Sequence, residues 1–300
     1  MKKSFLQSNE WAEFQKSLGR EVLEYDKEGI SVQIIKHDLP FGKNYLYIPH
    51  GPEIDFNSMA GGFKNPINHF VQWLREDAKK CSIFIKAEPL TDNIAQILVE
   101  AGFRKSKKEI QPSKTVIIDL LRNENDLLVA MHHKTRYNIK VADGHGIRVT
   151  ENNDIDSFLK LLQKTAKRDR FSPHPADYYR KLLEFKSLNT KLFLAYIGDR
   201  PIAGAIVLIY NDAGYYLHGV SDYDQRSLMA PYALHWFIIK QLKLAGIQKY
   251  DLWGVDARKW PGITRYKLGW GGRTIEYPGS FDLVVSRAWY VIYKIARRIF

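Results

Sequence analysis

Three carboxylates lie where predicted strands end, a place from which acidic side chains can take part in proton transfer. Glu88 directly follows the apolar run 82–87. Asp251 and Asp256 lie at the end of a second apolar run. A carboxylate that faces a cleft at a strand end could accept a proton or hold an attacking amine. The structural alternatives stay open: Glu88 could cap the next helix, and the two aspartates could close the loop 257–262.

Positive charge dominates the chain and gathers in two segments. The 300 residues include 45 lysines and arginines against 33 acids, a net charge of +12. This balance favours polyanionic partners such as nucleic acid, anionic lipid or phosphorylated substrates. Lys134, Arg136 and Lys140 fall within two helical turns and could meet nucleic-acid phosphates, or form a solvated helix face.

The second basic segment is the C-terminal one. Residues 286–300 carry four basic residues and no acid among apolar and aromatic side chains. This composition is typical of an interfacial helix on an anionic membrane surface. A helix docked on the core of the protein would use the same apolar residues, so both interpretations stand.

Several protein classes are excluded by the composition. The single cysteine, Cys81, cannot form an intramolecular disulfide, and no Cys/His spacing resembles a zinc site. No stretch approaches the roughly 20 apolar residues that span a bilayer, and the N-terminus has no apolar signal core. We therefore expect a cytoplasmic protein, peripheral at the inner membrane face at most, with neither a metal nor a redox cofactor.

The elements that must position these residues alternate between strands and helices in two blocks. The chain exceeds the usual single-domain size of about 100–200 residues, and the polar stretch 105–113 is the best boundary. Helices are expected over 9–18, 65–80 and 92–101 in the first block and over 123–141 in the second. The second block continues with strands at 192–197, 201–210 and 215–220, a helix over 231–245 and a strand at 249–253. A meander, a helix and one more strand form the layout of the GNAT acyltransferase fold, a mixed α/β architecture.

Eight motifs run along the chain: SFLQSNEWAEFQKSLG near the N-terminus, YIPHGP at 47–52, IKAEP at 85–89, HKTRYNIKVADGHGIRV at 133–149, YYLHGVSD at 215–222, APYALHW at 230–236, YDLWGVD at 250–256 and ITRYKLGWGGRTIEYPGSFDLV at 263–284. In this order they resemble the FemABX aminoacyltransferases of peptidoglycan bridge synthesis. The resemblance implies two GNAT-like domains, 1–112 plus 286–300 and 113–285, with the C-terminal segment returning to the first. The region 123–147 has no room for the long helical arm of some members, which points to the arm-less, FemX-like type.

The resemblance implies transfer of an amino acid from aminoacyl-tRNA to an amine on the stem peptide of a peptidoglycan precursor. Lys267 aligns with the functional lysine of the family, where a fixed cation beside the reacting ester would stabilise an oxyanion. The alternative is that Lys267 is an ordinary surface lysine. Glu88 stands where the family has an acid next to proline and is the second candidate catalytic residue. The amino acid, its place in the bridge, and a lipid-linked or soluble nucleotide-linked acceptor all stay open.

Substrate-binding residues are implied as well. Tyr178 matches a tyrosine at the nucleotide-sugar site of the family, and His174 stands where the family has an arginine that contacts the diphosphate. Histidine is a weaker phosphate ligand at neutral pH, so Arg170 could take that role. His218 stands where some members have a tyrosine near the substrate. Tyr266 stands where the family has an aromatic residue, often Phe, directly before the lysine. Both could equally be core residues.

Two other classes of function remain as alternatives. An acyl-CoA-dependent N-acyltransferase would hold the CoA pyrophosphate with backbone amides of a glycine-rich loop. The corresponding loop, 221–230, has no glycine, and Pro231 removes one amide. A non-catalytic RNA-binding or membrane-surface module is the other alternative, and the presence of Lys267 argues against it.

Overall fold

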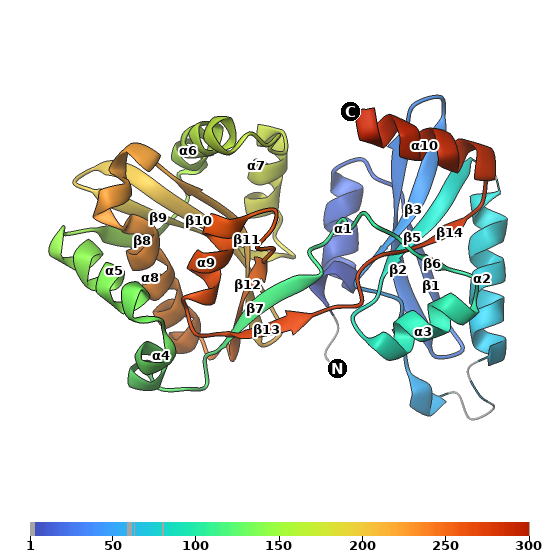
Figure 1. The fold of residues 1–300 in the computed structure, drawn as a ribbon, viewed down its shortest axis with the longest axis horizontal. Coiled ribbons are helices and arrows are strands. Elements are labelled where there is room, and N and C mark those ends of the chain that lie inside the picture. The colour runs from blue at the N-terminus through green and yellow to red at the C-terminus, as the bar shows by residue number, and fades with distance from the viewer. Residues whose placement is uncertain (1–3, 59–61, 63, 80, 300) are drawn as a thin grey trace. The chain divides into compact units, whose positions relative to one another are not determined.

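The chain folds into two compact units, each with its own sheet and core (Figure 1). The computed structural model describes residues 4–58, 62, 64–79 and 81–299. Unit 1 comprises Met1–Ser113 with Glu276–Phe300, and unit 2 comprises Lys114–Ile275.

Unit 1 is built on a mixed sheet that contains seven strands among the described residues. The strand order is β1 (Val22–Lys27), β2 (Ile30–Leu39), β3 (Lys43–Pro49), β5 (Ser82–Glu88), β14 (Phe281–Val284) and β6 (Arg104–Lys105), with β4 (Glu53–Ile54) paired to β2. The helical elements are η1 (Phe5–Gln7), α1 (Asn9–Ser17), η2 (Phe56–Ser58), α2 (Lys64–Ala78), α3 (Asp92–Glu100) and α10 (Arg287–Ile299). The expected helices at 9–18, 65–80 and 92–101 are confirmed. Ser8 starts α1 and Thr91 starts α3, each accepting a backbone N–H bond in its first turn.

The two faces of this sheet differ in chemistry. Aliphatic side chains such as Ile34, Leu46 and Ile85 form one core with the apolar residues of α2 and α3. The next residues along the strands alternate to the opposite face. There the rings of Tyr45 and Phe84 stack at 4.9 Å, and Tyr290 and Tyr293 of α10 pack against Phe84.

The C-terminal segment returns to unit 1 earlier than the expected residue 286. Strand β14 pairs antiparallel with β5, setting Phe281 opposite Ala87, and also pairs with β6. Phe281 and Leu283 are buried in the core of unit 1. This pairing assigns the chain from Glu276 onward to unit 1, whereas the sequence expectation placed 113–285 together.

Unit 2 has a second mixed sheet, also with seven strands in the described part of the chain. The strand order is β13 (Arg273–Glu276), β7 (Lys114–Asp119), β12 (Lys249–Gly254), β11 (Ala213–Ser221), β10 (Arg200–Tyr210), β9 (Asn189–Ile197) and β8 (Arg148–Asn152). The helical elements are α4 (Glu124–Ala130), α5 (His133–Gly144), α6 (Ile155–Asp169), α7 (Ala176–Glu184), η3 (Tyr223–Leu228), α8 (Ala230–Leu244) and α9 (Pro261–Leu268).

Both units repeat one layout. In unit 1 the antiparallel strands β1, β2 and β3 lead through α2 to β5, which pairs parallel with β3. In unit 2 the meander β9, β10 and β11 leads through α8 to β12, which pairs parallel with β11. The expected meander, helix and strand are therefore confirmed, and the chain is a mixed α/β protein with tandem GNAT-like units.

The expected single helix over 123–141 is wrong, because the chain breaks into α4 and α5. Met131 between them is extended, with φ −68° and ψ 148°. The Arg136 guanidinium donates to the carbonyl oxygens of Leu128 and Met131, and so provides hydrogen bonds to carbonyl groups left unpaired at the end of α4. Both helices are short, which agrees with the arm-less type. Among the described residues, no helix has the length and apolar character needed to cross a bilayer.

Candidate functional site

Lys267 is buried in the last turn of α9, which excludes the surface-lysine alternative. Pro261 opens this helix, and Thr264 and Lys267, one turn apart, face inward with 5% and 8% exposure. The Lys267 Nζ donates to the carbonyl oxygen of Gly254 at 2.8 Å and lies 5.5 Å from the ring centroid of Tyr216. Burial lowers the pKa of Lys267 to about 8, partly offset by the charge of Asp251. The ammonium form therefore prevails at pH 7, but it gives up its proton far more easily than an exposed lysine.

Asp251 is the buried acid of the same site. Its Oδ1 accepts hydrogen bonds from the Thr115 hydroxyl and, at 2.7 Å, from the backbone N–H of Trp253. Burial raises its pKa to about 6, against the opposing effects of these bonds and of Lys267. Asp251 is thus ionised at pH 7 and supplies a negative charge that acts on the lysine.

The end of strand β12 is distorted beside these two groups. Regular pairing with β7 breaks between Asp251 and Gly254, and Trp253 takes a φ of 60°. A bulky residue rarely adopts this conformation, and such strain gathers at functional sites. The Gly254 carbonyl that holds Lys267 lies at this break. Asp256, farther along, accepts from the N–H groups of Arg258 and Lys259, as its loop-closing alternative predicted.

An aromatic layer covers the lysine. The ring of Tyr216 meets His235 of α8 edge to face at 4.4 Å, and His235 Nδ1 lies 3.0 Å from the Tyr250 hydroxyl. Burial, aided by the charge of Lys267, lowers the pKa of His235 to about 3, so this ring is neutral near pH 7. A Cβ at Gly219 would lie 1.5 Å from the Tyr216 hydroxyl oxygen, so glycine is required for this ring position.

Tyr266 precedes the lysine, but its hydroxyl is used inside the protein. Its Oη donates to the carbonyl oxygen of Pro231 at 2.9 Å, and its ring packs edge to face on Tyr232. The glycines that follow have a structural reason as well. A Cβ at Gly271 would lie 2.3 Å from the Ala130 carbonyl oxygen. A substrate-binding role for Tyr266 stays a prediction.

The structure brings three of the expected substrate residues together. His174 stacks on Tyr178 with ring centroids 4.2 Å apart, and His218 lies 5.8 Å from Tyr178 and 5.0 Å from the buried Tyr179. Burial and the neighbouring His174 lower the pKa of His218 to about 3. Within the described part of the chain, the buried His218 Nε2 has no hydrogen-bond partner. We call these four residues the His174 cluster.

A bulge in β11 separates this cluster from the lysine. Tyr216 pairs with Val207 and His218 pairs with Ile206, so one residue, Leu217, is extra. Paired residues point to the same face, and Val207 belongs to the core that includes α8. Tyr216 is therefore directed toward α8 and Lys267, while His218 is directed toward α7.

Arg170 lies near the His174 cluster in sequence and ends α6 in a left-handed conformation, with its side chain exposed. A hollow of about 430 Å³ lies between α6 and α7, and His174, Lys160 and Arg180 are among its lining residues. Arg180 is paired with Asp156 at 2.5 Å. The hollow combines these polar groups with apolar lining residues such as Leu159, Leu162 and Pro173.

Glu88 is buried in unit 1 and its oxygens are occupied. It accepts from the Tyr47 hydroxyl at 2.6 Å and from the N–H groups of Ile110 and Gln111 at 2.6 and 2.9 Å. Burial raises its pKa despite these bonds. The contacts fix the segment that leads into β7. They give Glu88 a positioning function, and its catalytic role stays a prediction.

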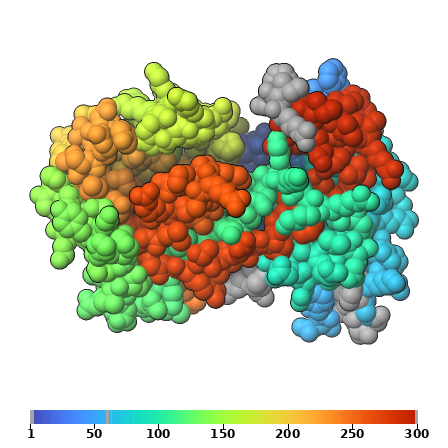
Figure 2. All heavy atoms as spheres, viewed as in Figure 1, coloured from blue at the N-terminus to red at the C-terminus, as the bar shows by residue number. Residues whose placement is uncertain are grey.

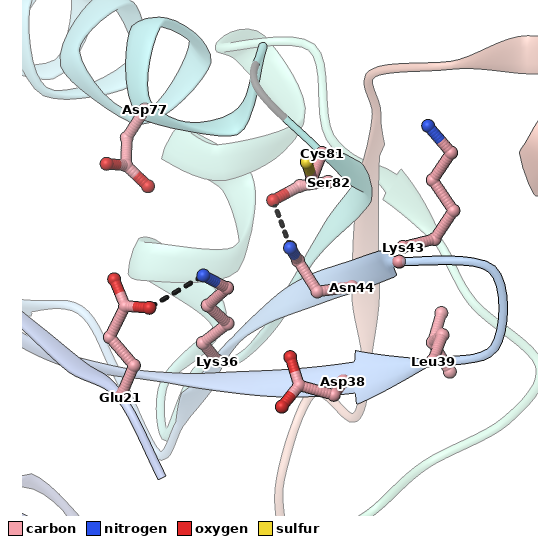
Figure 3. Close-up of a pocket in the computed structure, with 10 residues that line it drawn as sticks. Glu21, Lys36, Asp38, Leu39, Lys43, Asn44, Asp77, Cys81 and Ser82 are labelled. Atoms are coloured by element: carbon pink, nitrogen blue, oxygen red, sulfur yellow. Dashed lines mark hydrogen bonds and ion pairs between the residues drawn. The ribbon is translucent and has the colours of Figure 1, made fainter.

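A second hollow of about 430 Å³, in unit 1, contains none of the expected site residues (Figure 3). Lys36 points to Glu21 and pairs with it at 2.6 Å, and the Ser82 hydroxyl donates to Asn44. Cys81 lies at its edge and is exposed. Among the described residues, no group of three or more His, Cys, Asp or Glu side chains could hold a metal ion.

Known proteins resemble this chain over most of its length. The FemAB family profile matches residues 90–200 and 198–298. A lipid II:glycine glycyltransferase of Staphylococcus epidermidis is 20% identical, covering 98% of this chain and 91% of that protein. The Staphylococcus aureus protein of the same name is also 20% identical, and the match covers 95% of this chain and 89% of that protein.

Solved structures share the fold. The crystal structure of FemX superposes with a TM-score of 0.79 at 19% identity, covering 96% of this chain and 94% of that one. A tandem GNAT protein from the clavulanic acid biosynthesis pathway gives a TM-score of 0.55 at 11% identity, covering 86% and 79%.

Proposed function

The chain belongs to the FemAB family, and from this premise we propose that it is an aminoacyltransferase that moves an amino acid from aminoacyl-tRNA to the stem-peptide amine of a peptidoglycan precursor. The buried Lys267 beside Asp251 is the observation that carries the proposal. The amine nitrogen attacks the ester carbonyl, an amide C–N bond forms, and the C–O bond to the tRNA ribose breaks. The amine loses one proton and the ribose oxygen gains one.

Lys267 can serve both halves of this exchange. As an ammonium group it stabilises the negative charge that develops on the ester oxygen. With its pKa near 8, it is acidic enough to protonate the leaving oxygen, and the neutral amine can then take the proton that the substrate amine loses. In this proposal Asp251 is a positioning residue, because its carboxylate keeps the lysine protonated until the reaction begins.

The His174 cluster is the proposed acceptor site. The stacked rings of His174 and Tyr178 offer a flat surface to a sugar or base, and the exposed Arg170 guanidinium could hold a phosphate. The names of the staphylococcal relatives favour a lipid-linked acceptor. The exposed Lys134 and Lys140 of α5 are proposed contacts for tRNA phosphates. Arg136 is unsuited to that role, because its guanidinium is engaged with α4.

The acyl-CoA alternative is weakened by the loop between β11 and α8. Its N–H groups are used internally: Asp224 donates to the Asp222 side chain, and Gln225 donates to the Asp222 carbonyl. The buried Asp222 carboxylate is paired with Arg200 at 2.7 Å and with Lys164 at 3.3 Å, so these two cations are already engaged within the protein.

The test is an incubation of the purified protein with charged tRNAs, acyl-CoAs and precursor acceptors, with products identified by mass. We expect the precursor to gain one aminoacyl group only when charged tRNA is present. Acylation from an acyl-CoA would favour the alternative enzyme, and the absence of any product with the full panel would contradict the proposal.

A further inference from the structure

Helix α10 is docked on unit 1 by tyrosines rather than by aliphatic residues. The rings of Tyr290 and Tyr293 lie 5.3 and 5.0 Å from the ring of Phe84, and the Tyr290 hydroxyl donates to Asp282 at 2.6 Å. Asp282 is itself paired with the buried Lys86 at 2.6 Å. The inward face of α10 is therefore aromatic and hydrogen-bonded, and it is fixed to the sheet.

The aliphatic residues of the same helix point outward. Val291, Ile292 and Ile295 are 55%, 52% and 52% exposed and lie on one helical face. A helix that packs only for stability turns its aliphatic side inward and its polar side to water. In α10 the aliphatic residues are instead exposed, and Figure 2 shows this helix in dark red at the surface.

The turn between β2 and β3 extends this apolar surface. Phe41 at its tip is 85% exposed and has a φ of 63°. Its ring centroid lies 6.3 Å from that of Trp289, over which Lys43 Nζ sits at 5.2 Å from the centroid. We call Phe41, Val291, Ile292 and Ile295 the α10 patch.

The charged side chains of α10 have one sign. Arg287, Lys294 and Arg297 of the helix are exposed, Lys43 lies beside Trp289, and residues 285–300 contain no acid. The Lys108 Nζ also donates to the Arg297 carbonyl oxygen at 2.7 Å. Apolar side chains ringed by cations complement a surface that presents anionic groups above a hydrocarbon layer.

We propose that the α10 patch docks the protein on an anionic phospholipid bilayer. The aliphatic residues and Phe41 enter the level of the headgroups, and the surrounding lysines and arginines contact the lipid phosphates. Trp289, beside Phe41, remains at the boundary, where its mixed polarity is favourable. The inference does not rest on the transferase function, since it uses only the contacts and charges of unit 1.

Cosedimentation with vesicles tests the proposal. The full chain is mixed with phosphatidylglycerol vesicles, with phosphatidylcholine vesicles, or with free inorganic phosphate added as a competitor. We expect binding to the anionic vesicles alone, and no competition by phosphate at equal ionic strength. The double variant Ile292→Glu/Ile295→Glu should reduce the bound fraction about tenfold or more, because it removes two apolar contacts.

A matched variant controls for added charge. Val129 and Leu244 in unit 2 are 79% and 82% exposed, so Val129→Glu/Leu244→Glu makes the same change away from the patch and should bind vesicles like the wild type. Melting temperatures of all variants confirm folding. Three results would each overturn the proposal: no wild-type binding to anionic vesicles, equal loss in both double variants, or a wild-type dimer in sedimentation velocity that Ile292→Glu/Ile295→Glu dissociates.

Discussion

The Lys267 ammonium donates a 2.8 Å hydrogen bond to the carbonyl oxygen of Gly254, where strand β12 leaves regular pairing. One neutral acceptor compensates only part of the cost of burying a charge. The buried Lys267 therefore lowers the stability of the fold, as expected of a functional residue rather than a structural one.

We predict that Lys267→Met stabilises the protein while it removes activity. The Lys267 pKa falls from 10.5 to about 8 on folding, which destabilises the folded state by roughly 3 kcal/mol at pH 7. The variant also loses the hydrogen bond from Lys267 to the Gly254 carbonyl oxygen, and this loss offsets about 1 kcal/mol of the gain in stability. The free energy of unfolding should rise by about 1–3 kcal/mol in urea titrations.

The pH dependence of stability provides an internal control for that prediction. Because the folded pKa lies below the unfolded one, the unfolded state binds more protons between pH 8 and 10.5. The wild type should gain stability as the pH rises through this range, and Lys267→Met should lack that gain. A variant that is less stable than the wild type at pH 7 would show that the lysine contributes to folding.

Asp251→Asn should change the pH profile of transfer more than the binding of substrate. With Asp251 ionising near pH 6 and Lys267 near pH 8, kcat/KM should be bell-shaped between these values. Removing the carboxylate charge should abolish the acidic limb and move the alkaline limb below pH 8, because the charge that favours protonated lysine is gone. An unchanged profile would remove Asp251 from the mechanism.

Gly219→Ala should impair catalysis through Tyr216. The new methyl group would occupy the place of the Tyr216 hydroxyl, so the ring must leave its position below Lys267. We expect kcat to fall about tenfold or more with a smaller change in KM. Gly144→Ala is the matched control, because nothing lies within 4 Å of a Cβ there. Equal kcat values for the two variants would contradict this positioning role.

Acetyl-CoA should not bind measurably, because the N–H groups of Asp224 and Gln225 already have partners within the loop and cannot hold a pyrophosphate. Isothermal titration checks this directly. Micromolar affinity would give preference to the acyl-CoA-dependent enzyme.

The motif around Lys267 was sufficient to single out this residue, but not to show its burial. A lysine near the end of an eight-residue helix can lie on either the exposed or the buried face of that helix. Only the tertiary contacts of Lys267 with Gly254 and Tyr216 show that it is buried. The sequence shows Asp251 as an acid at a strand end but not its partner, because Thr115 is far away along the chain and reaches Asp251 only through the pairing of β7 with β12.

Two features could not be predicted from the local sequence. The motif YYLHGVSD contains no sign of the bulge that directs Tyr216 and His218 to different helices, because the bulge depends on the register with β10. The basic and apolar composition of 286–300 gave two interpretations of the segment. The structure shows docking through Tyr290 and Tyr293 and exposure of the aliphatic residues, so deletion of the whole segment would disturb the fold as well as the patch.

The most direct measurement of the central claim is the single-turnover rate of aminoacyl transfer from charged tRNA to a lipid-linked peptidoglycan precursor, compared between the wild type and Lys267→Met. The account predicts a product heavier by one aminoacyl group and a rate lower by about 10²–10³ in the variant, with both proteins folded. A folded Lys267→Met protein that transfers at the wild-type rate would contradict it.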